Sequence, residues 1–214
     1  LVGTIVSRPD YADDFWCDER IDYTATPAVP EQRVPANESF EDFLPENSRI
    51  AATDPWEVVT DPLLMITKNG ALTWGDRMYI MPNPADCSRA EFMVWAHTYD
   101  DASLLALEGQ DVDGAFNLLL VEQQRVPLEA PVPLANALYA PIHGREWPPF
   151  AVGSFVFGSF DFDRIIAAEG DPSVFGFSLE FAEGTAGLRD NYWSLEGLFA
   201  AGNEAMRLCR ENNQ

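Results

Sequence analysis

The stretch that decides the fold is the end of the chain, Asn191-Tyr-Trp-Ser-Leu-Glu-Gly-Leu-Phe-Ala-Ala-Gly-Asn-Glu-Ala-Met-Arg-Leu-Cys209. Trp193 and Leu195 alternate with polar residues, which predicts a short strand with one apolar face. Gly197 is a usable N-cap for a helix that follows this strand. The inner stripe of that helix, with gaps of four, three and four residues, consists of Leu198, Gly202, Ala205 and Cys209. The pattern predicts a helix near 198–212 that closes the core of an all-β domain.

Upstream of this segment, two further elements are well marked. Val174–Ala182 alternates phenylalanine and leucine with small or polar residues, so we expect a strand with one packed and one solvated face. Residues 161–169 predict a short helix that Asp161 caps and Gly170 ends. Phe150–Phe157 reads as a buried strand.

The middle of the chain predicts consecutive antiparallel hairpins. Their turns are expected at Asn69-Gly70, Asp100-Asp101 and Asp113-Gly114. Residues 125–149 contain six prolines and are expected to be a crossover loop with at most a turn or two of helix at Leu134–Tyr139. Because helices do not alternate with strands, the fold class predicted is all-β and mainly antiparallel, a β-sandwich or a partly closed barrel.

Residues 1–54 differ from the β-domain predicted for residues 55–214. They form an acidic, proline-rich arm with no sustained periodicity. The aromatic residues spaced along it are Tyr11, Phe15, Trp16, Tyr23, Phe40 and Phe43. A long arm without secondary structure is unusual in a compact monomer. We therefore expect these rings to anchor the arm across its own domain or across a protein partner.

The charge of the chain is strongly negative. Its 214 residues include 35 acidic and 13 basic side chains, a net charge of −22. Such a field repels nucleic acids and anionic lipid, and it attracts basic protein surfaces or divalent cations; alternatively, the acidity only maintains solubility. No apolar run is long enough to span a bilayer. Residues 1–6 are expected to be an edge strand or the end of a signal or anchor, so tethering by a segment that precedes Leu1 is left open.

Three cysteines indicate the compartment. Cys17, Cys87 and Cys209 show no C-x-x-C spacing, which argues against zinc ribbons and redox motifs. Cys87 lies in a turn between two predicted strands, and Cys209 lies on the inner stripe of the last helix. We predict a Cys87–Cys209 disulfide and a periplasmic or secreted protein, with Cys17 free or paired with another chain. Three free thiols in a cytosolic protein are the alternative.

The segment from Trp193 to Ala205, Trp-Ser-Leu-Glu-Gly-Leu-Phe-Ala-Ala-Gly-Asn-Glu-Ala, resembles the closing strand and helix of invasion-associated-locus-B-type periplasmic β-proteins. The resemblance implies an exported β-domain. It covers this segment alone, the cysteines elsewhere do not follow that family, and no function is transferred from it.

Motifs for catalysis are absent from the sequence. It has no P-loop, no G-x-G-x-x-G, no H-E-x-x-H and no G-x-S-x-G. His97 and His143 are its two histidines, and each is expected to be a hydrogen-bonded structural residue. Asp111 and Asp113 resemble part of a calcium loop, but the rest of that pattern is missing. We predict no cofactor and no metal site, with calcium on the acidic surface as a minor alternative.

The six tryptophans divide between strands and irregular segments. Core packing is expected for Trp56, Trp74, Trp95 and Trp193, and exposure for Trp16 and Trp147.

These observations leave two hypotheses for the function of the protein. The favoured one is a non-enzymatic, extracytoplasmic binding or accessory subunit of a larger protein or membrane-associated complex, which docks through its arm. The alternative is a carboxylate-based hydrolase or carbohydrate-binding protein with a site in a sheet cleft, assisted by His97 or His143.

Overall fold

The computed structural model describes residues 44, 54–73, 75–140 and 150–213, apart from the side chain of Ala140. These residues belong to one compact unit, Val34–Gln214. The predicted arm, with the exception of Leu44 and Asp54, lies outside the described residues.

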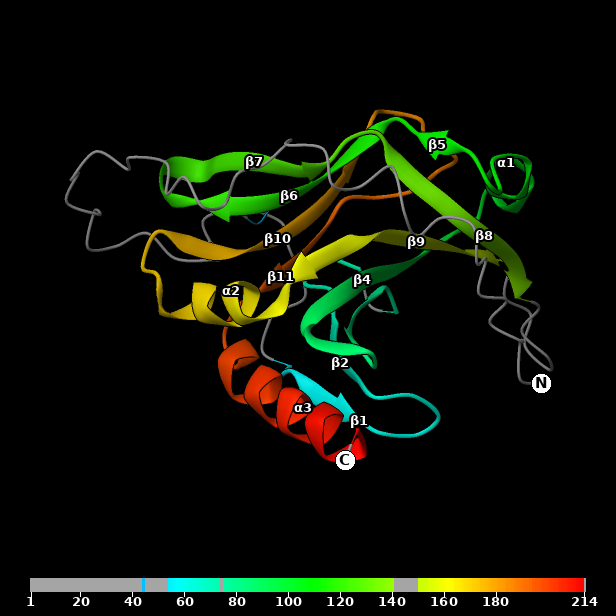
Figure 1. The fold of residues 1–214 in the computed structure, drawn as a ribbon. Coiled ribbons are helices and arrows are strands. Elements are labelled where there is room, and N and C mark those ends of the chain that lie inside the picture. The colour runs from blue at the N-terminus through cyan, green and yellow to red at the C-terminus, as the bar shows by residue number, and fades with distance from the viewer. Residues whose placement is uncertain (1–43, 45–53, 74, 141–149, 214) are drawn as a thin grey trace. The chain divides into compact units, whose positions relative to one another are not determined.

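Two antiparallel sheets make up the described part of the chain (Figure 1). The seven-stranded sheet has the order β1 (Glu57–Val59), β2 (Met65–Asn69), β3 (Arg77–Asn83), β4 (Asp86–Thr98), β9 (Phe150–Asp161), β8 (Val132–Ala140), β5 (Asp111–Val112). The four-stranded sheet has the order β11 (Asn191–Ser194), β10 (Val174–Phe181), β6 (Gly114–Leu120), β7 (Gln124–Glu129). The helical segments are α1 (Asp101–Ala106), η2 (Val121–Gln123), α2 (Phe162–Ala167), η3 (Ala168–Gly170) and α3 (Leu198–Asn212). The all-β prediction is confirmed as two open sheets, and neither closes into a barrel.

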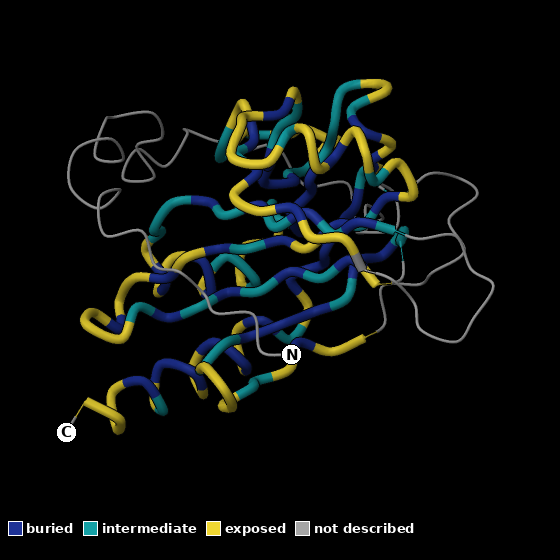
Figure 2. Tube along the Cα trace, turned by 90° about the vertical axis from the view of Figure 1, so that its right-hand side faces the viewer, coloured by how far each residue is buried: buried dark blue, intermediate teal, exposed yellow. Residues whose placement is uncertain are grey.

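The core lies between the sheets and is rich in phenylalanine. Phe92 of β4 lies 5.5 Å from Phe177 of β10 and 5.8 Å from Phe116 of β6, measured between ring centroids. Phe116 in turn stacks on Phe157 of β9 at 4.3 Å. Figure 2 shows that buried residues follow the strands and one side of the last helix, whereas exposed residues gather at turns. Rings from both sheets therefore meet in one cluster, as sandwich packing requires.

Helix α3 forms as the sequence predicts. Its buried residues are Leu198, Ala201, Gly202, Ala205, Met206 and Cys209, which include every member of the predicted stripe. Gly197 is the N-cap with a φ of 84°, and it has no side chain that could accept from the first turn. Glu169 supplies that acceptor from η3, because its carboxylate accepts from the backbone N–H groups of Gly197, at 2.8 Å, and Phe199. A carboxylate at this end also complements the helix dipole.

The three predicted hairpin turns are wrong in detail. β2 and β3 do pair, but residues 70–76 connect them and Gly75 rather than Gly70 has a positive φ, of 103°. Asp100 is not in a turn; it caps α1 by accepting from Ser103 N–H at 3.3 Å. Asp113 lies where the chain crosses from β5 in the larger sheet to β6 in the smaller one. A turn dipeptide thus marks a change of direction without specifying which strands pair.

The prediction of a crossover loop over residues 125–149 is also wrong, because this segment contains most of β7 and all of β8, with no helical turn at 134–139. Pro127 lies in β7, at the edge of the smaller sheet, and Pro133 of β8 pairs only with two-residue β5. Proline is tolerated at both positions because one side of the strand needs no ladder hydrogen bond there.

The alternation in β10 is present, but its second face is not solvated. Ser178 is fully buried and its hydroxyl accepts from Asn117 Nδ2 at 3.2 Å. Leu119 and Tyr192, on the neighbouring strands, are buried in a small cluster with Ala71. The expected solvated face therefore carries a second apolar cluster of its own.

Replacing Gly202 by alanine is expected to lower the free energy of unfolding by about 1–2 kcal/mol. A Cβ at this position would overlap Ile166 Cγ2 of α2 and lie 3.0 Å from Ile166 Cβ. Alanine is favoured over glycine in a helix by roughly 1 kcal/mol, so the overlap has to exceed that gain. Urea unfolding measures the difference. Gly170→Ala is the matched control, because a Cβ there meets nothing within 4 Å, and a smaller Gly202→Ala loss in an Ile166→Ala background would locate the overlap.

Candidate functional site

A buried carboxylate joins the two sheets at one end. Asp76 precedes β3 and is 1% exposed. Its Oδ1 accepts from the backbone N–H of His97 at 3.0 Å and lies 2.6 Å from His97 Nδ1. Its Oδ2 accepts from Asn191 Nδ2, the first residue of β11, at 3.1 Å. This contact occupies Nδ1, so Nε2 is the second polar atom of the ring.

Asn191 completes this network with four contacts. Its Oδ1 accepts from Leu72 N–H at 3.0 Å and Tyr192 N–H at 2.9 Å, and its Nδ2 also donates to Thr73 O at 3.3 Å. A Cβ on Gly70 would overlap the Asn191 amide. Glycine is therefore needed at position 70 for close approach of the loop to β11, which explains why the Asn69-Gly70 pair does not form a tight turn.

A pocket of about 200 Å³ opens beside this network. It is lined by Thr73, His97, Thr98, Tyr99, Asp100, Gly187 and Arg189. These residues come from the β2–β3 loop, the end of β4 and the loop that leads into β11. The Thr98 hydroxyl donates to Ala186 O at 2.8 Å and accepts from Asp100 N–H at 3.0 Å, which holds the last loop against β4.

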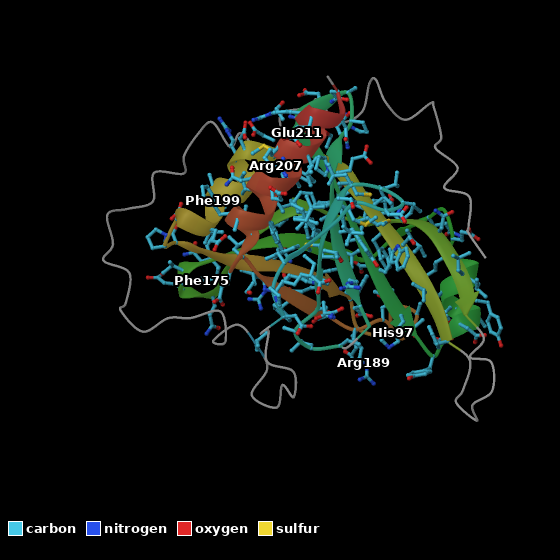
Figure 3. The ribbon with its side chains drawn as sticks, turned by 90° about the horizontal axis from the view of Figure 1, so that it is seen from below. His97, Phe175, Arg189, Phe199, Arg207 and Glu211 are labelled. Carbon is cyan, nitrogen blue, oxygen red and sulfur yellow. A yellow bond between two sulfur atoms is a disulfide. The ribbon has the colours of Figure 1, made fainter. Side chains whose placement is uncertain are left out.

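His97 and Arg189 are the two residues of the pocket with nitrogen side chains, and they lie at the same edge of the molecule (Figure 3). The imidazole is edge-on to Tyr99 at 6.1 Å and to Phe150 at 5.9 Å between centroids, and its side chain is 21% exposed. No described residue hydrogen-bonds to Nε2. Arg189 is exposed, and it is the one arginine within the described residues that forms no hydrogen bond or ion pair.

The arrangement can bind an anion or exchange a proton. A histidine whose Nδ1–H is held by a buried carboxylate presents Nε2 as a base when neutral and as a donor when protonated. The Thr98 hydroxyl is already used in two hydrogen bonds, so it is not free to act as a nucleophile. In the described part of the chain, no three His, Cys, Asp or Glu side chains come together as a metal site.

A buried lysine lies apart from the pocket. Lys68 of β2 is 2% exposed, its Nζ donates to Ser194 Oγ at 2.8 Å, and it lies 5.7 Å from the centroid of the Trp56 ring. Burial lowers the pKa of this ammonium, and the acidic side chains of Glu196, Asp54 and Glu169 offset part of the decrease. Its contacts are those of a residue that fixes β2 against β11.

The predicted disulfide is present. The sulfur atoms of Cys87 and Cys209 are 2.08 Å apart and the two Cα atoms 5.9 Å apart. Cys87 is the second residue of β4, directly after the β3–β4 turn. The bond therefore joins the end of α3 to the larger sheet.

The other predicted residues have mixed outcomes. His97 is hydrogen-bonded as expected, and Asp161 caps α2 by accepting from Arg164 N–H at 3.1 Å. Trp56 and Trp193 are buried, but Trp95 is 42% exposed on the outer face of the larger sheet, so its assignment to the core is wrong. The predicted residues that lie outside the described part are the arm aromatics Tyr11, Phe15, Trp16, Tyr23, Phe40 and Phe43, together with Cys17, Trp74, His143 and Trp147.

Three residues of the site were missed by the sequence analysis: Asp76, Asn191 and Arg189. Asp76 is 21 residues from His97 and 115 from Asn191, and no local periodicity relates them. The sequence feature closest to the site was Gly70, which we interpreted as part of a hairpin turn.

No family model, curated protein or solved structure matches this chain. The likeness of the closing segment to locus-B-type proteins therefore stays a sequence resemblance. Within the described residues, no helix is long and apolar enough to cross a membrane.

Proposed function

We propose that this chain is a non-enzymatic, extracytoplasmic binding or accessory subunit of a larger protein assembly, and that it docks through its N-terminal arm. The Cys87–Cys209 disulfide supports the compartment, because such bonds persist in oxidising environments. A periplasmic or secreted location follows from this proposal.

The binding role rests on the outer face of the seven-stranded sheet. Trp95 is 42% exposed, and its ring lies 5.0 Å from that of half-buried Tyr79. Tyr79, Met93 and Val156 are paired across three adjacent strands, which forms an apolar row beside Trp95. Apolar patches of this kind, rich in aromatic residues and methionine, are typical of protein interfaces. Given the net charge of −22, the partner would combine an apolar centre with a basic rim.

The arm supplies the remaining contacts in this proposal. Its aromatic residues are spaced as isolated anchors, which is how rings serve as binding hot spots. Leu44, at the carboxyl end of the arm, is half-buried against the cluster formed by Ala71, Leu119 and Tyr192.

Cross-linking and affinity capture of the full oxidised chain from its native extract test the proposal. We expect a defined partner to be retained, and to be lost when the six arm aromatics are replaced by alanine. Phe199→Ala is the matched control, since Phe199 is 53% exposed and belongs to α3 rather than to the arm. Limited proteolysis of the isolated chain can contradict the proposal. If the chain is a monomer and its arm resists cleavage, the arm is covered by its own domain and the basis for docking is removed.

The carbohydrate alternative is favoured by one observation, the exposed Trp95 ring next to Tyr79, because sugars stack on exposed aromatic rings. The two rings are tilted by 59° and so do not form one flat platform. Titration with a panel of oligosaccharides would support this alternative if binding occurred and Trp95→Ala abolished it. Absence of binding across the panel would eliminate it.

A further inference from the structure

We infer that the pocket between His97 and Arg189 is a binding site for a carboxylate group, held by the Arg189 guanidinium and by the His97 imidazole. This inference concerns a small ligand and does not rest on the proposed docking function. Its basis is Arg189, which forms no hydrogen bond or ion pair with any described residue, and His97, whose Nδ1 contacts Asp76.

Arg189 is unusual in its surroundings. Four of the other described arginines, Arg77, Arg125, Arg164 and Arg207, are each paired with a carboxylate. Arg189 lines the pocket without such a pair, although the chain has 35 acidic residues against 13 basic ones. A guanidinium presents a planar fork of donors that matches the two oxygens of a carboxylate.

His97 provides the second contact. Asp76 holds Nδ1 at 2.6 Å, and two aromatic rings flank the imidazole, so the ring is fixed and Nε2 remains for a ligand. Protonated Nε2 donates a hydrogen bond, which a carboxylate oxygen accepts.

The remaining charges favour a monoanion over phosphate. The ionisable groups that line the pocket or contact His97 are Asp76, Asp100, Tyr99 and Arg189, whereas the neighbouring strand β9 faces it with apolar Val152 and Phe150. Two acidic side chains, Asp76 and Asp100, therefore already lie at the pocket or against His97. A dianion would bring two negative charges next to Asp100 in a protein of net charge −22. Its electrostatic repulsion would therefore be greater than that of a monoanion. The volume of about 200 Å³ suits a carboxylate with a short chain.

Two sources have this chemistry, a free short-chain acid and the C-terminus of a polypeptide. We would titrate the full oxidised chain with propionate, with acetyl-Gly-Gly bearing a free carboxylate, with its C-terminal amide, and with inorganic phosphate. NMR of ¹⁵N-labelled histidine reports contact at the imidazole. Saturable shifts are expected for both acids and none for the amide. Peptide affinity about tenfold or more above that of propionate would assign the site to a chain terminus, and equal affinities to a free acid.

Arg189→Gln should weaken binding by about tenfold or more, the size of a lost charge-assisted hydrogen bond. Because Arg189 contacts no described residue through a hydrogen bond or ion pair, this variant is expected to fold normally. Arg164→Gln, which removes an exposed paired arginine elsewhere, is the matched control. Tighter binding of phosphate, absence of saturation with either acid, or an unchanged affinity of Arg189→Gln would each overturn the inference.

Discussion

Removal of the Cys87–Cys209 disulfide is expected to lower the free energy of unfolding by about 4–5 kcal/mol. The two cysteines are 122 residues apart in sequence, so the bond closes a loop that contains most of the described domain. A cross-link of this span restricts the unfolded chain strongly, and its loss increases the entropy of that state. Urea denaturation of the oxidised protein, the reduced protein and the Cys87→Ala/Cys209→Ala variant measures the effect.

The control for this experiment is Cys17→Ala, which leaves the bond intact and should match the parent protein. Intact mass before and after reduction, followed by peptide mapping, should show Cys87 linked to Cys209. A double variant within about 1 kcal/mol of the parent would mean that the bond contributes little to stability. Three free thiols in protein from its native source would remove the argument for an oxidising compartment.

The sequence correctly predicts the elements that are marked by a regular spacing of apolar residues or by a helix-capping residue. α3 has an apolar stripe with helical spacing, and α2 begins at an Asp whose side chain accepts from its first turn. The sequence of β10 alternates apolar with small or polar residues from Phe175 to Phe181. In each case the information lies within one element, where a period of 3.6 or 2 residues decides the secondary structure.

The errors occur where distant segments decide the structure. Gly70 is required by the Asn191 amide of a different sheet, and Asp113 lies at a crossing between sheets. β7 and β8 carry prolines that suggest a loop. They are acceptable because β7 is an edge strand and Pro133 of β8 pairs only with β5. Local turn and breaker signals report backbone preference, and the pairing of strands is decided by contacts that they do not encode.

The candidate site follows the same logic. Asp76, His97, Asn191 and Arg189 come from a loop, the end of a strand, the start of another and a second loop. Each polar group in a buried network needs a hydrogen-bond partner. The partners here come from both sheets, so the folded geometry and not the local sequence decides which residues belong to the network. In a chain with 35 acidic residues, one functional carboxylate is not distinguishable by composition.

Phe92→Ala is expected to lower the free energy of unfolding by about 3–5 kcal/mol. Phe92 is completely buried near the middle of β4. Its ring contacts Phe116 and Phe177 of the smaller sheet and lies 5.1 Å from Phe160 of β9. Truncation would remove these contacts and leave a cavity between the sheets, which rigid flanking strands can fill only in part. Urea unfolding followed by tryptophan fluorescence would report the loss, and Phe92→Leu should recover part of it.

Trp95→Ala is the matched control, because Trp95 lies on the same strand and on its opposite, exposed face. Its loss should change stability by less than about 1 kcal/mol. If Phe92→Ala were no more destabilising than Trp95→Ala, the phenylalanine cluster would not hold the two sheets together. A Trp95 variant that keeps its stability is also the appropriate protein for testing the sheet face as a binding surface, since a lost partner could then not be attributed to unfolding.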